Sequence, residues 1–112
     1  MKKIALILTL ILLVSAGFAQ RSKVVTAYNY QRNGKLEKAK EAIDEAIEHE
    51  KTMADPKAWF YRGAIYQDIA AGVDSSLYNK VPNALDVAYE SYQKSVEYDE
   101  KEKYVEQIKL NM

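Results

Sequence analysis

Apolar residues recur along the chain with the spacing of one face of an α-helix. Between residues 36 and 50 they appear every three or four positions, and similar stripes cover residues 23–32, 56–70 and 83–96. A further stripe begins after residue 99 and continues toward the end of the chain. After residue 20, no segment alternates with a period of two over five or more positions, so no β-strand is predicted. The pattern therefore predicts an all-α protein with four helices and the start of a fifth.

Capping residues support the first and third helices. Ser22 is an expected N-cap for the first helix, and Asn33-Gly34 is an expected stop because both residue types accept the left-handed conformation. Asp55-Pro56 opens the third helix, since Asp caps well and Pro at the first helical position sacrifices no needed hydrogen bond.

The segment after the third helix lacks a helical period. Gly72–Val81 is rich in turn-forming residues, and we expect a loop there. Asn83 with Asp86 resembles a capping box for the fourth helix, and Asp99 with Glu102 has the same spacing before the fifth.

The second, third and fourth helices each carry a feature that bears on packing. The second helix carries charged residues, Asp44 and Glu45 among them, outside its apolar stripe, and we expect these to form a solvated face. Gly63 falls inside the third helix, where Gly costs about 1 kcal/mol relative to Ala, so another helix is expected to approach closely there. The stripe of the fourth helix consists of Leu85, Ala88, Tyr89, Tyr92, Ser95 and Val96.

The helices form an internal repeat. The second and fourth helices match at an offset of 49 residues, and the first and third match at an offset of 36. The first and second helices therefore form one hairpin, which the third and fourth helices repeat. The two offsets differ because the segment around 72–81 is inserted between the helices of the second hairpin. The matched positions are Leu36, Ala39, Ile43 and Ala46 with Leu85, Ala88, Tyr92 and Ser95, and Lys23, Ala27 and Tyr30 with Trp59, Gly63 and Tyr66.

These residues resemble the tetratricopeptide repeat (TPR) family. Trp59-x2-Arg62-Gly63-x2-Tyr66 is similar to the family pattern W-x2-L-G-x2-Y, with Arg62 in place of an apolar residue. The resemblance covers roughly residues 20–99 and implies antiparallel hairpins stacked as an α-solenoid. It implies repeat one at about 20–53, repeat two at about 56–100 with an inserted loop at 72–81, and the first helix of a third repeat at 101–112.

The resemblance also bears on the ends of the chain. About three repeats are usually needed for stability in this architecture. We therefore expect the sequence to be the N-terminal part of a longer TPR protein. Two alternatives are that the fifth helix caps a small two-repeat domain, and that the protein self-associates through this C-terminal helix.

The N-terminal residues have the pattern of a secretory signal peptide. Lys2 and Lys3 precede an apolar stretch of 15 residues, Ile4–Phe18, and a small-x-small cleavage site ends at Ala19. A transmembrane span would need about 20 apolar residues, so cleavage after Ala19 is favoured over a retained anchor. The prediction is an exported, periplasmic or secreted chain of residues 20–112 with no stable membrane anchor.

Composition excludes several function classes. The chain has 16 basic and 16 acidic residues, so a general nucleic-acid binder is not expected. It has no cysteine, and His49 is its single histidine, which argues against disulfides, thiol catalysis and a zinc site. No phosphate-binding glycine motif is present. We therefore expect no cofactor, no metal and no enzymatic activity.

The predicted function is a non-enzymatic protein–protein interaction scaffold in the periplasm. In the TPR family the first helices of the hairpins line the binding surface, and the resemblance implies a groove that binds a protein or peptide of the cell envelope. One alternative is an envelope glycan-binding protein that uses Tyr and Trp as stacking surfaces. Another is an accessory TPR domain of a larger envelope assembly protein or enzyme. The implied groove residues are Val24, Tyr28, Gln31, Arg32, Phe60, Ala64, Gln67 and Asp68.

Overall fold

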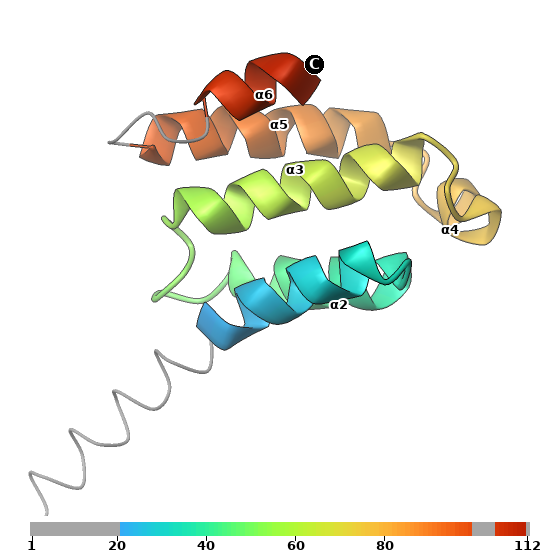
Figure 1. Cartoon of the computed structure of the whole chain (residues 1–112), viewed down its shortest axis with the longest axis horizontal. Helices are drawn as coiled ribbons and strands as arrows, with labels where there is room; N and C mark the ends of the chain where they lie inside the picture. Colours follow the sequence, from blue (N-terminus) through green and yellow to red (C-terminus); the bar gives the residue numbers. More distant parts are fainter. Residues whose placement is uncertain (1–20, 100–104, 112) are drawn as a thin grey trace, which may run out of the picture.

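The computed structural model describes residues 21–99 and 105–111, and within these ranges the protein is helical without strands, as predicted (Figure 1). The leader predicted at residues 1–19, and Glu102 of the predicted cap, lie outside the described residues. A helix over residues 21–32 is followed by α2 (Leu36–Ala46), α3 (Pro56–Ala70), α4 (Ser75–Lys80), α5 (Ala84–Tyr98) and α6 (Val105–Asn111).

The helix over residues 21–32 and α2 are joined by a tight turn. Gly34 has a φ of 76°, and the Lys35 N–H donates to the Tyr30 carbonyl at 2.8 Å, so the predicted Asn33-Gly34 stop is confirmed. Ser22 is already helical, so its predicted role as an N-cap is wrong.

α2 is shorter than the sequence predicts. It ends at Ala46, and turns rather than helix follow as far as Glu50. The hydroxyl of the buried Thr52 donates to the Ala46 carbonyl, which would bond to the Glu50 N–H in a continued helix. A side chain six residues along the chain thus satisfies the carbonyl at which the helix ends.

α3 and α5 pack along each other in opposite directions. The Ser95 hydroxyl donates to the Pro56 carbonyl at 2.8 Å near the start of α3, and Arg62 donates to Ser91 at 3.1 Å further along. At Gly63 the approach is so close that a Cβ would lie 2.6 Å from ring carbons of Tyr92. The close approach expected from a mid-helix Gly is therefore confirmed.

The predicted loop 72–81 contains a helix. α4 spans Ser75–Lys80, so the loop prediction is wrong for these six residues. The Asp74 carboxylate accepts from the Leu77 N–H at 3.2 Å, and Leu77 is buried. An N-cap and one buried anchor are enough to hold this short helix.

The buried face of α5 also differs from the predicted one. Leu85, Tyr89 and Val96 belong to the predicted stripe, yet they are among the exposed large apolar residues. The face of α5 that packs on α3 carries the Tyr92 ring against Gly63. Leu85, Tyr89 and Val96 each follow a buried residue by one position, so they point about 100° away from that face. The buried residues of α5 are Ala84, Ala88, Ser91, Tyr92 and Ser95.

One buried apolar cluster connects the helix of residues 21–32 and α2 with α3, α4 and α5. A second, smaller cluster connects α6 to the rest through Ile108, Tyr92 and the half-buried Phe60. The first cluster consists of Val24, Ala27, Leu36, Ala39, Ile43, Ala46, Ala58, Ile65, Tyr66, Ile69, Leu77, Ala84 and Ala88.

Candidate functional site

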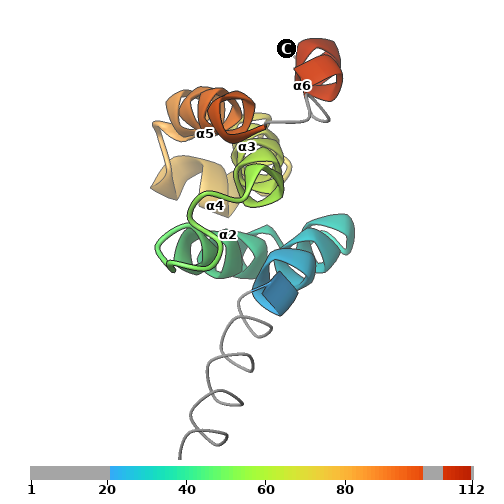
Figure 2. The same cartoon turned by 90° about the vertical axis from the view of Figure 1, so that its left-hand side faces the viewer.

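The helix of residues 21–32 and α3 lie side by side and run in the same direction. The rings of Tyr28 and Tyr61 are stacked, with centroids 4.7 Å apart and an interplanar angle of 18°. Further along both helices, the Gln31 amide donates to the Asp68 carboxylate at 3.0 Å. The helix of residues 21–32 lies on the side of α3 away from α5 (Figure 2).

Two basic side chains lie next to the stacked tyrosines. The Arg32 guanidinium is 5.6 Å from the centroid of Tyr28, and the Lys57 ammonium is 5.6 Å from that of Tyr61. Neither has a carboxylate partner within the described ranges. We call this surface the Tyr28–Tyr61 seam; it consists of Tyr28, Gln31, Arg32, Lys57, Tyr61 and Asp68.

The structure brings four of the predicted groove residues together. Tyr28, Gln31, Arg32 and Asp68 all belong to the seam. Val24 does not, because its exposure is 2%, and its expected place on an exposed surface is wrong.

The other three predicted groove residues also lie on α3, between or next to its seam residues in the sequence. Phe60 packs near Tyr92, with ring centroids 6.0 Å apart, and Gln67 donates to the Asn111 carbonyl of α6 at 2.8 Å. Ala64 is half-buried. Of the predicted set, four residues thus belong to the seam, Val24 lies in the core, and Gln67 contacts α6. Phe60 lies near both regions, since its ring is also 5.9 Å from that of Tyr61.

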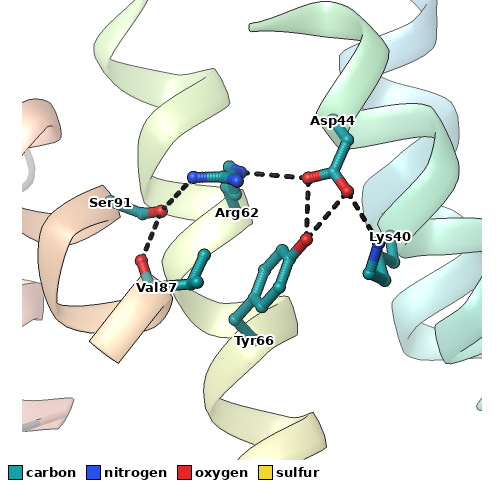
Figure 3. Close-up of polar contacts among 6 residues, drawn as sticks. All are labelled: Lys40, Asp44, Arg62, Tyr66, Val87 and Ser91. Atoms are coloured by element: carbon teal, nitrogen blue, oxygen red, sulfur yellow. Dashed lines mark hydrogen bonds and ion pairs between the residues drawn. The ribbon is translucent and has the colours of Figure 1, made fainter. Parts of the chain in front are cut away.

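A polar cluster that the sequence analysis missed lies between α2, α3 and α5 (Figure 3). The Asp44 carboxylate accepts hydrogen bonds from Lys40 at 3.0 Å, from Arg62 at 3.0 Å and from the Tyr66 hydroxyl at 2.8 Å. Arg62 also donates to Ser91, whose hydroxyl donates to a carbonyl of its own helix. The expectation that Asp44 belongs to a solvated face is therefore wrong.

The cluster shifts the pKa values of two of its members. Burial, together with the hydrogen bond to Asp44 and its charge, raises the pKa of Tyr66 above the usual 10.0. Burial acts to lower the pKa of Lys40, but the hydrogen bond and charge of Asp44 outweigh it and raise the value above 10.5. Both groups therefore keep their protons at neutral pH, and the hydrogen bonds of the cluster join α2, α3 and α5.

The signal for this cluster was present in the sequence. Arg62 occupies a position where the TPR pattern has an apolar residue, and a half-buried guanidinium requires an acceptor. The side chain of Arg62 is 17% exposed in the structure, and that of Asp44 is 30% exposed.

A groove of about 560 Å³ lies between α3, α5 and α6. We call it the α5–α6 groove. The Tyr92 hydroxyl donates to Gln67 at 2.7 Å, and Asn111 of α6 completes this polar contact. Leu85 and Tyr89 contribute the apolar part of the lining. Burial chiefly raises the pKa of Tyr92, so its hydroxyl stays neutral near pH 7.

Metal-ligating side chains are scattered over the described residues. No group of three or more His, Cys, Asp and Glu side chains gathers there in a way that could hold a metal ion. His49 lies in the turns after α2, where its Nδ1 accepts from the Lys51 N–H at 3.2 Å. Within the same ranges, no helix combines the length and apolar character that a membrane span requires.

Comparison of the chain with protein-family models, with curated proteins and with solved structures found no match. The geometry of the seam, the polar cluster and the groove is therefore the basis for proposing a function.

Proposed function

We propose that the chain is an exported, non-enzymatic interaction scaffold built from TPR-like repeats, which binds a protein or peptide of the cell envelope along the Tyr28–Tyr61 seam. The observation that carries the proposal is the parallel contact between the helix of residues 21–32 and α3. These are the first helices of the two hairpins expected from the sequence repeat. Their stacking supports a solenoid in which equivalent helices form one continuous surface.

The course of α6 supports the same architecture. In Figure 1, α3 and α6 run in the same direction and α5 runs in the opposite direction. A third helix parallel to the first two is what the start of a third repeat would give. α6 also contacts α3 directly, through the bond between Gln67 and Asn111.

The chemistry of the seam favours a peptide with acidic and apolar groups. The two half-buried tyrosines are held in place by their mutual stacking, so they lose little conformational entropy on binding. Arg32 is exposed and lies beside this surface, and a guanidinium binds a carboxylate in a bidentate manner. The neighbouring Gln31 and Asp68 are bonded to each other, which holds the two helices in register.

The test is capture of partners from envelope extracts by the purified full chain and by matched variants. We expect Tyr28→Ala and Arg32→Ala to reduce capture of one or more defined proteins. Val25→Ala and Lys35→Ala are the matched controls, because both residues are exposed and lie outside the seam. Circular dichroism must show unchanged helicity in all four variants.

Three outcomes would count against the proposal. Equal losses in seam and control variants would mean that the seam is not the binding surface. Retention of the chain on envelope polysaccharide, without any captured protein, would favour the glycan-binding alternative. A leader that remains attached, detected by intact mass, would contradict the predicted cleavage near Ala19.

A further inference from the structure

The α5–α6 groove is distinct from the seam and has an apolar rim. Leu85 and Tyr89 of α5 are 66% and 51% exposed, and both line the groove. Leu110 of α6 is 86% exposed and neighbours Asn111, which also lines it. Exposed apolar residues that gather at a concave site are typical of interaction surfaces.

The charges in the groove have one sign. Asp86 and Glu90 lie one turn apart on α5, and both belong to the lining. Within the described part of the chain neither carboxylate has a hydrogen-bond or ion-pair partner. None of the described lining residues is basic. Like charges four residues apart on a helix repel each other, so a basic ligand would relieve an unfavourable interaction.

The polar groups at the base of the groove are already engaged. Gln67 bonds to both Tyr92 and the Asn111 carbonyl, which leaves the apolar side chains and the two carboxylates as the groups available to a ligand. Recognition would therefore depend on apolar contact and on charge, and not on a network of neutral hydrogen bonds.

We propose that the α5–α6 groove docks a basic amphipathic helix of a partner protein. Its apolar residues contact Leu85 and Tyr89, and its Lys or Arg residues pair with Asp86 and Glu90. A helix suits the site because helices α5 and α6 form its walls, and an amphipathic helix buries one face in such a groove. The proposal does not rest on the function assigned to the Tyr28–Tyr61 seam.

The probe is a pair of synthetic helical peptides of about 18 residues, long enough to form helix in isolation. Both carry Leu at every third or fourth position. One has Lys on the flanks of this stripe, and the other has Glu. Binding to the purified full chain, expressed with its own leader, is measured by fluorescence anisotropy. We expect the Lys peptide to bind at least about tenfold more tightly than the Glu peptide, with a preference that declines as salt is added.

Matched variants place the binding in the groove. Leu85→Ser should lower the affinity for the Lys peptide about tenfold or more. Val73→Ser should leave this affinity unchanged. Val73 is as exposed as Leu85, at 66%, but lies before α4 and outside the groove. Asp86→Asn combined with Glu90→Gln should remove the preference for Lys over Glu. Arg32→Ala should have no effect, which separates this groove from the seam.

Several results would overturn the proposal. These are equal binding of the two peptides, equal effects of Leu85→Ser and Val73→Ser, and the absence of saturable binding. A dimer seen by light scattering and abolished by Leu85→Ser would assign the groove to a second copy of the chain instead.

Discussion

Asp44 on α2 and Arg62 on α3 form an ion pair between the first and second hairpins, with 3.0 Å between Oδ1 and Nε (Figure 3). We predict that Asp44→Ala lowers the free energy of unfolding by about 1–3 kcal/mol, because it leaves the half-buried Arg62 and the buried Tyr66 hydroxyl without their acceptor. Urea unfolding followed by circular dichroism measures this change.

The control for this variant is Glu41→Ala. Glu41 is a carboxylate one turn earlier on α2, but it is exposed and makes no ion pair within the described residues. It should change stability by less than about 0.5 kcal/mol. A double-mutant cycle of Asp44→Ala with Arg62→Ala should give a positive coupling energy. Additive effects would show that the pair does not hold the hairpins together.

Gly63 supplies a second prediction, about packing. Gly63→Ala should gain about 1 kcal/mol of helix propensity. It should nevertheless destabilise the protein, because the new methyl group would lie 2.6 Å from the ring of the buried Tyr92. In a Tyr92→Leu background the ring is gone, and the same substitution should become less harmful. Equal effects of Gly63→Ala in both backgrounds, measured by thermal unfolding, would refute this account of the close approach.

Local signals predicted much of the fold, because they act within a few residues. The turn at Gly34 and the start of α3 at Pro56 follow from the φ preference of Gly and the capping ability of Asp55. The wrong loop prediction at Gly72–Val81 also concerned local signals. Asp74 caps α4 and Leu77 anchors it in the core, but the many turn-forming residues of the segment favoured a loop.

Contacts between distant parts of the chain determine which face of α5 is buried, and the sequence pattern alone does not predict this. α5 has two overlapping apolar stripes, and the helical period does not say which of them faces α3. In the structure Ala88 and Tyr92 are buried, with the Tyr92 ring in the space beside Gly63, whereas Leu85 remains exposed. For the same reason the α5–α6 groove could not be anticipated. Four residues of the seam, Tyr28, Gln31, Arg32 and Asp68, are among those that the resemblance to the TPR family implies for a binding groove.

The caps of α3 and α5 give a third prediction. The Asp55 carboxylate accepts from the Lys57 N–H at 3.0 Å, whereas Asn83, at the equivalent position of α5, makes no side-chain cap bond. Asp55→Ala should therefore cost about 0.5–2 kcal/mol, and Asn83→Ala should cost close to nothing. The two variants are each other's control in one set of denaturant titrations. A larger loss for Asn83→Ala would contradict the observed difference between the caps.

The raised pKa values of Tyr66, Tyr92 and Lys40 predict a loss of stability in alkali. All three groups hold their protons more tightly in the folded protein than in the unfolded chain, where the usual values are 10.0 for Tyr and 10.5 for Lys. Their contribution is complete below about pH 10 and is lost as the pH rises above that value, because the unfolded chain releases its protons first.

The variant that isolates one of these contributions is Tyr66→Phe. At about pH 8 it should be less stable than the parent chain, because the bond from the hydroxyl to Asp44 is lost. Between about pH 8 and pH 11 its free energy of unfolding should fall less steeply, because one raised pKa is missing from the folded state. Tyr78→Phe is the control, since Tyr78 is 49% exposed and lies on α4, away from Asp44. If both variants followed the same slope with pH, the buried phenol of Tyr66 would not be a source of the alkaline instability.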